Sequence, residues 1–149
     1  MKTVYSVIFL PFLIILLLVT SVNGYDDWLI YDTSNEGDIY LYNKVSINHR
    51  TKDILQVWCK QVYSDKSRED YIQVMTKSGS FTKTELEKLS FVIILQEIDC
   101  KGKKHRILSM TGYDEGGKTL YSGSDDKEKW RYIIPDSRDD ELRKKVCPK

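Results

Sequence analysis

The chain has 149 residues, 41% of them hydrophobic, and its 23 Lys and Arg residues are balanced by 22 Asp and Glu residues. Because the net charge is only +1, the composition excludes a general electrostatic attraction to nucleic acid or to anionic membranes. The length suits one domain built around one hydrophobic core.

The N-terminus has the pattern of a secretory signal peptide. Lys2 precedes an apolar run at Val7–Val19, and small residues follow up to Gly24. A charged start, an apolar block of about a dozen residues and small residues at its end are typical of a cleaved signal. We therefore predict a signal peptide at 1–24 and a single mature domain at 25–149.

An uncleaved membrane anchor is the alternative for this segment, and cleavage after Ser21 is the second choice of site. A spanning helix needs roughly 20 apolar residues, whereas this run is shorter and contains Pro11. The first cysteine is Cys59, so no cysteine is placed for N-terminal lipid attachment. We expect an exported protein, periplasmic or secreted, that is not a lipoprotein and has no stable membrane span after cleavage.

Alternating apolar and polar residues predict strands in the first half of the mature chain. In the clearest of them, Leu55, Val57 and Cys59 share one face, while Trp58 and Lys60 share the other. A polar loop is expected at 64–70 and a short extra strand at 71–75. The strands are predicted at 28–32, 39–42, 45–47 and 54–62.

The second half is predicted to begin with a short helix at 84–90, because Thr82 with Glu85 and Thr84 with Glu87 both match a capping box. A long strand is expected at 91–100, with Val92, Ile94, Ile98 and Cys100 on one face. Short turns favour antiparallel pairing of the strands that follow. These segments are the turn 101–103, the strand 104–111, the turn 114–117, the strand 118–122 and the polar loop 124–129.

The chain is predicted to close with a strand and a helix. Pro135 ends the strand because it cannot donate a hydrogen bond, and Asp136 or Ser137 can cap the helix that follows. Acidic residues begin that helix and basic residues end it, as the helix dipole favours. The predicted fold is α+β: an antiparallel sheet of about six strands with the C-terminal helix packed on it.

Three cysteines in an exported chain indicate one disulfide and one remaining thiol. Cys100 and Cys147 each end a predicted element and are the better pair, although spacing alone leaves the other pairings open. Cys59 is most simply a small buried apolar residue.

No catalytic, cofactor or metal motif is found in the sequence. His49 and His105 are the only two histidines, and they lie in separate predicted elements. Acid–base cleavage of RNA by this pair is a remote alternative, and two surface histidines are the favoured interpretation. We expect a protein that is not an enzyme, with no cofactor and no metal.

The densest basic run is the candidate binding site, and it lies at a predicted hairpin turn. Such a run can hold a polyanion, for example a glycosaminoglycan or a phosphate-bearing lipid head group. An ordinary solvated turn is the favoured alternative. The run consists of Lys101, Lys103, Lys104, His105 and Arg106.

Aromatic residues are a second candidate for binding, because they dominate the energetics of many interfaces. Alternation along the strands also places some of them in the core. The residues considered are Tyr31, Tyr40, Tyr42, Trp58, Tyr63, Tyr71, Trp130 and Tyr132.

An ordered set of short motifs across nearly the whole mature chain resembles the surface-adhesin protein E family of exported bacterial proteins. Each motif is weak alone, and their order and spacing carry the resemblance. The matching pieces are Trp28, Val57-Trp58-Cys59-Lys60, Asp99-Cys100-Lys101, Arg106-Ile107-Leu108-Ser109, Tyr113-Asp114 with Gly116-Gly117, Trp130, Ile134-Pro135-Asp136-Ser137 and Val146-Cys147.

The resemblance implies an antiparallel sheet whose C-terminal helix is tied back by a disulfide, which here falls on Cys100 and Cys147. It implies a non-enzymatic adhesin that binds host proteins and can form a homodimer. The chain departs from the family pattern in having Cys59 at a usually apolar position and in lacking a lipid anchor.

Two functions follow as expectations. The first is an exported adhesin-like protein that contacts host or cell-envelope macromolecules, its partner being a protein or a polyanionic envelope or matrix ligand. The alternative is a small envelope protein that acts as an inhibitor or sensor.

Overall fold

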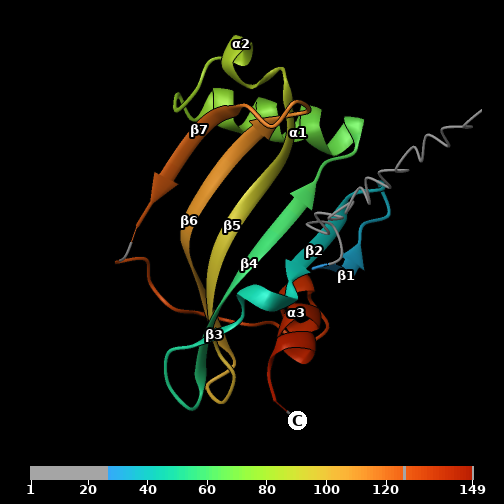
Figure 1. The fold of residues 1–149 in the computed structure, drawn as a ribbon. Coiled ribbons are helices and arrows are strands. Elements are labelled where there is room, and N and C mark those ends of the chain that lie inside the picture. Colours follow the sequence, from blue (N-terminus) through green and yellow to red (C-terminus); the bar gives the residue numbers. More distant parts are fainter. Residues whose placement is uncertain (1–26, 126, 149) are drawn as a thin grey trace, which may run out of the picture.

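The computed structural model describes residues 27–125 and 127–148 (Figure 1). The predicted signal peptide at 1–24 lies outside the described residues, so the division into a leader and a domain at 25–149 stays a prediction. Within the described residues, no helix combines the length and the apolar character needed to cross a membrane.

The body of the molecule is an eight-stranded antiparallel sheet, which confirms the predicted fold class. Six strands form a continuous path in the order β1-β2-β4-β5-β6-β7, while β3 pairs with β4 and β8 pairs with β6. The strands are β1 (Trp28–Thr33), β2 (Ile39–Asn43), β3 (Asn48–His49), β4 (Ile54–Val62), β5 (Leu89–Asp99), β6 (Lys104–Asp114), β7 (Thr119–Ser124) and β8 (Arg131–Tyr132).

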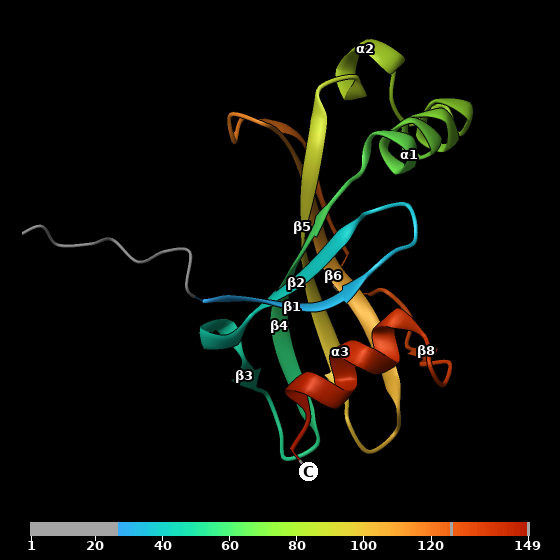
Figure 2. The ribbon, with the colours of Figure 1, turned by 90° about the vertical axis from the view of Figure 1, so that its right-hand side faces the viewer.

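The chain has three α-helices in its described part, which are α1 (Asp65–Lys77), α2 (Lys83–Leu86) and α3 (Arg138–Val146). Figure 2, with the sheet nearly edge-on, shows α1 and α3 on one side of the sheet and α2 beside α1 near the start of β5. The first of the two predicted capping boxes starts α2, since Thr82 and Glu85 exchange side-chain hydrogen bonds with each other's backbone amides. The helix is shorter than the predicted 84–90, because Leu89 and Ser90 already belong to β5. Ser137 caps α3 by accepting the amide hydrogen of Asp140.

The predicted loop at 64–70 and strand at 71–75 are wrong, because both segments lie in α1. Ser64 caps this helix by accepting the amide hydrogen of Ser67. The Ser64 amide donates in turn to the buried carboxylate of Asp38, at 2.8 Å. A contact with a distant strand end therefore fixes where the helix starts, and local polarity alone does not reveal it.

The predicted strand at 45–47 is also wrong, because the 3-10 helix η1 (Lys44–Ser46) occupies most of it. The side chain of Asn43 accepts hydrogen bonds from the amides of Val45 and Ser46, each at 3.1 Å. These bonds turn the chain immediately after β2 and end the extended conformation.

The main core lies between the sheet and α3. The alternation predicted for β4 and β5 is confirmed for the residues that lie within these strands, which are buried: Leu55, Val57, Cys59, Val92, Ile94 and Ile98. Cys100, predicted on the same face, lies just beyond the end of β5 and is only partly buried. Leu142 and Val146 supply the apolar stripe of α3. The buried cluster consists of Tyr42, Leu55, Val57, Cys59, Leu89, Val92, Ile94, Ile98, Ile133, Leu142 and Val146.

A disulfide between Cys100 and Cys147 joins the end of β5 to the end of α3, with their Cα atoms 5.7 Å apart. This confirms the pairing that the family resemblance implies. Cys59 is a free cysteine with 2% of its surface exposed. Burial raises the pKa of its thiol, so the buried group stays protonated at neutral pH.

Candidate binding surface

The two faces of the sheet have different surroundings. Residues paired across neighbouring strands point to the same side, so the strand register assigns each side chain to a face. The helix face carries the core and is covered by α1 and α3, whereas none of the three described α-helices packs on the opposite face. We call this second side the open face, and Figure 1 looks onto it.

The open face has an apolar centre that spans three central strands. In β5, residues on the helix face are buried, whereas Phe91, Ile93 and Leu95 on the open face stay partly exposed. Trp58 of β4 lies opposite Leu95 and is 38% exposed. The register groups the apolar centre of the open face as Ile39, Leu41, Trp58, Val62, Phe91, Ile93 and Leu95.

Part of this surface is fixed by contacts within the chain. The rings of Phe91 and Tyr113 are stacked with their centroids 5.1 Å apart. The ammonium of Lys60 lies 4.0 Å from the centroid of Phe91. Partial burial lowers the pKa of Lys60. Trp58 is the large residue of the apolar centre that is most exposed for contact with a partner.

The end of the open face next to the β5–β6 turn, which we call its lower end, holds a buried ion pair. Glu97 is 6% exposed and lies 2.5 Å from the guanidinium of Arg106. The second carboxylate oxygen of Glu97 accepts a hydrogen bond from Gln56 at 2.9 Å. Arg106 also lies over the ring of Trp130, 4.8 Å from its centroid. The polar atoms of Glu97 have their partners within the chain. The network therefore stabilises the sheet beside the apolar centre.

The structure splits the predicted basic run between three places. Lys101 and Lys103 are exposed in the β5–β6 turn. Lys104 and Arg106 lie on the open face, where Lys104 stands 4.6 Å from the ring centroid of Tyr132. His105 points to the helix face, with its Nε2 atom 3.5 Å from the carboxylate of Asp139. The run thus provides a basic end to the open face, and its binding role stays a prediction.

The two histidines are not brought together. His49 pairs with Leu55, Leu55 with Ile98, and Ile98 with His105. Three strand spacings separate the two backbones by roughly 14 Å, and the side chains of Leu55 and Ile98 lie between them. His105 is also directed toward Asp139. This arrangement gives no support to shared acid–base chemistry.

The aromatic candidates divide between the two faces. Tyr31, Tyr40 and Tyr42 form a cluster on the helix face, and the Arg138 guanidinium lies 3.8 Å from the ring centroid of Tyr40. Tyr63 and Tyr71 contact each other beside α1, with centroids 5.2 Å apart. Trp58, Trp130 and Tyr132 are the members that the register and the cation contacts assign to the open face.

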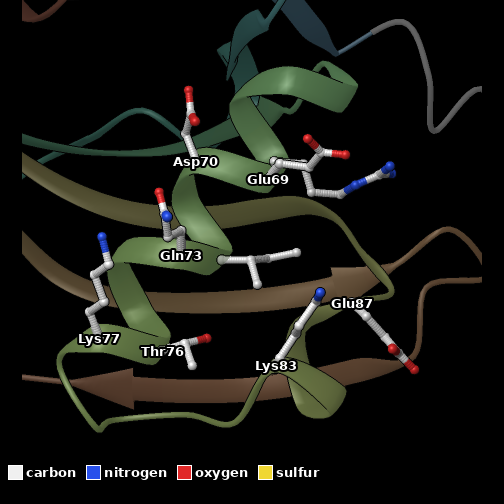
Figure 3. A pocket seen from close by; sticks show the side chains of 9 residues that line it. Glu69, Asp70, Gln73, Thr76, Lys77, Lys83 and Glu87 are labelled. Carbon is white, nitrogen blue, oxygen red and sulfur yellow. The ribbon is translucent and has the colours of Figure 1, made fainter.

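A polar groove of about 690 Å³ lies between α1 and α2. In Figure 3, Gln73, Thr76 and Lys77 project from α1 on one side, and Lys83 and Glu87 lie across from them. Three basic and three acidic residues line the groove together with Ile72, Gln73 and Thr76. Its charges are balanced, and neither His nor Cys is among the described residues that line it.

One close group of carboxylates, Asp136, Asp140 and Glu141, is found in residues 27–125 and 127–148. The ammonium of Lys144 lies 3.5, 3.0 and 2.8 Å from these three side chains. Hydrogen bonds from Arg143 and Lys144 lower the pKa of Asp140 to about 2. Because protein cations already neutralise this group, its arrangement indicates a structural role at the start of α3.

Solved structures similar to this chain are those of protein E from Haemophilus influenzae. The structure from a non-typeable strain is 13% identical, covers 81% of this chain and 75% of its own, and superposes with a TM-score of 0.50. A second protein E structure is 14% identical, with a TM-score of 0.49 and coverage of 81% and 83%. At this identity the likeness concerns the fold alone.

A search of curated proteins found no match. The family description "Surface-adhesin protein E" matches residues 28–148, which is nearly the whole described chain. The chain therefore belongs to the surface-adhesin protein E family.

Proposed function

We propose that this chain is an exported, non-enzymatic, adhesin-like protein that binds a host or cell-envelope protein through the apolar centre of its open face. The observation that carries the proposal is the partly exposed apolar centre around Trp58, on the side of the sheet that none of the described α-helices covers. Membership of a surface-adhesin family indicates an exported or surface protein with an adhesin-like role.

The charges around this surface favour a protein partner of defined character. Lys101 and Lys103 are exposed in the turn at the lower end of the open face, and Lys104 points to the same face. A partner with an apolar patch bordered by acidic side chains would complement this arrangement. Aromatic anchors surrounded by polar residues are also the usual form of a binding hot spot.

A direct binding experiment tests the proposal. The mature chain is immobilised and probed with purified extracellular-matrix proteins and with separated bacterial envelope proteins. We expect saturable binding that Trp58→Ala weakens at least tenfold, as expected for a central aromatic anchor. Val74→Ala is the matched control, because Val74 is 63% exposed on α1, on the covered side of the sheet.

The basic turn has its own test. Charge reversal by Lys101→Glu together with Lys103→Glu is expected to slow association and to reduce the salt dependence of the association rate. Binding that survives Trp58→Ala and is abolished by the charge reversal would instead indicate a polyanion bound at the turn. Equal binding by all variants, or none by the folded wild type, would count against the proposal.

A further inference from the structure

The outer edge of β7 has no neighbouring strand among the described residues. β7 is the last strand on the sheet path and, in the part of the chain that the structure describes, it pairs with β6. The Asp125 amide donates to the carbonyl of Leu108 in β6. Because inward and outward groups alternate along an antiparallel strand, the amides and carbonyls of Ser122 and Ser124 face outward.

One register shift interrupts the pairing of β7 with β6 between Thr119 and Tyr121, and the part of the edge that carries Ser122 and Ser124 lies beyond it. The sequence Thr119–Ser124 contains neither a charged residue nor a proline. Natural sheets commonly place lysine, proline or a covering element on an exposed edge to prevent pairing with another chain. An edge that retains its pairing capacity can bind an extended peptide as an additional strand.

An apolar groove of about 380 Å³ lies beside β7 on the helix face. Its walls include Tyr71 and Met75 of α1, Phe81, and Met110 and Tyr121 of the strands. The hydroxyls of Tyr71 and Tyr121 are 2.8 Å apart, and the rings of Phe81 and Tyr121 have centroids 4.9 Å apart. These contacts hold the walls in place.

Gly123 leaves part of the groove open. Residues 121 and 123 point to the helix face, and a Cβ atom at Gly123 would meet no heavy atom within 4 Å. A side chain from a neighbouring strand can therefore lie over this glycine. Asp125, which is exposed, lines the groove near the end of β7.

We infer that β7 and this groove form a second recognition site, which binds an extended polypeptide segment of a partner protein by strand addition. The segment pairs its backbone with Ser122 and Ser124 and places apolar side chains, at every second position, in the groove. A polypeptide matches both features, because it carries regularly spaced amides and carbonyls together with alternating side chains. Glu128 and Arg131 also line the groove and pair with each other, so a basic residue beside the apolar positions would complement Asp125.

This inference goes beyond the proposed function, because the two sites lie on different parts of the sheet. The open face receives a folded surface over Trp58, whereas the β7 site receives an extended segment at the edge. Failure of one therefore leaves the other intact, and Trp58→Ala serves as the variant that keeps the β7 site.

A displayed library of random linear twelve-residue peptides tests the inference with the mature chain as bait. Ser122→Pro is the counter-selection variant. Proline removes the amide hydrogen of residue 122, which faces away from β6, so the hydrogen bonds between β6 and β7 are kept. Ser122→Thr retains the amide and is its matched control. Gly123→Val places a side chain in the groove without changing the amide of Ser122. It therefore tests the site even if the Ser122→Pro variant does not fold.

We expect enriched peptides with apolar residues at alternate positions. Their affinity should fall at least tenfold with Ser122→Pro or Gly123→Val and remain within twofold with Ser122→Thr or Trp58→Ala. Methylating the peptide amides that face β7 should abolish binding, and bound peptide should slow hydrogen exchange at Ser122 and Ser124.

Three results would overturn the inference. The first is the absence of enrichment above the counter-selection variant. The second is equal binding of the amide-methylated peptide, which would show that strand pairing is not used. The third is concentration-dependent self-association that Ser122→Pro removes, which would identify a second copy of this chain as the occupant of β7.

Discussion

The buried carboxylate of Glu97 is paired with the guanidinium of Arg106 across neighbouring strands β5 and β6. The pair lies on the open face, in the row next to the one that contains Trp58. It fixes two strands and the indole of Trp130 at the edge of the apolar centre. The open face is therefore a preorganised surface, which lowers the entropic cost of binding.

Breaking this ion pair should destabilise the fold. Arg106→Ala leaves the Glu97 carboxylate buried without its cation, so we expect the free energy of unfolding to fall by about 3 kcal/mol. Chemical denaturation at pH 7 measures the change. Arg131→Ala removes the exposed pair with Glu128 and should cost under about 1 kcal/mol. Equal losses in the two variants would contradict the structural role of Glu97 and Arg106.

Removing the disulfide should cost more than any single surface substitution. Cys100 and Cys147 are separated by 47 residues, and the chain-entropy model gives about 4 kcal/mol for a loop of this length. The double variant Cys100→Ser and Cys147→Ser is compared with wild type by denaturation. Cys59→Ala keeps the disulfide and is the control, with an expected loss of about 1 kcal/mol. A small effect of the double variant would show that α3 is held by packing alone.

Stability should decrease in acid through Asp140. Its pKa is about 2 in the folded chain, against roughly 3.9 for an unfolded aspartate. The unfolded state binds more protons between these values, so the contribution is fully present above about pH 4 and is lost as the pH falls toward 2. Denaturation midpoints from pH 2 to pH 6 should show a shallower slope for Asp140→Asn. Parallel curves would contradict the assigned pKa direction.

Replacing glycine by alanine should lower stability at Gly112 of β6 but not at Gly123 of β7. A Cβ atom at Gly112 would overlap the ring of Tyr121, whereas one at Gly123 has open space. We expect Gly112→Ala to cost about 2 kcal/mol through overpacking and Gly123→Ala to leave the thermal midpoint nearly unchanged. The reverse order would show that Tyr121 does not lie over Gly112.

The strand pattern and the closing helix could be predicted because their signals are local. Alternation identified the buried sides of β4 and β5, and the acidic start and basic end of α3 follow the helix dipole. The disulfide needed the family resemblance, since three cysteines permit three pairings. α1 was missed because Tyr71, Ile72 and Met75 form a narrow apolar stripe among polar residues, and its cap depends on Asp38.

The binding surface could be predicted only in part. Alternation places Trp58 and its neighbour Cys59 on different faces of the sheet. It does not show which of the two faces the helices cover. That choice depends on α1 and α3 lying on the same side, which is a tertiary property. The basic run looked like one site, but strand geometry sends His105 and Arg106 to opposite faces.

Site-specific photo-cross-linking shows which face of the sheet the partner contacts. A photoreactive amino acid replaces Trp58 on the open face or, as the control, Val74 on α1, and each folded chain is irradiated with the binding partner found in the panel of matrix and envelope proteins. We expect a covalent adduct from position 58 and none from position 74. Adducts from position 74 alone would contradict binding through the open face, because they would place the partner on the helix-covered side.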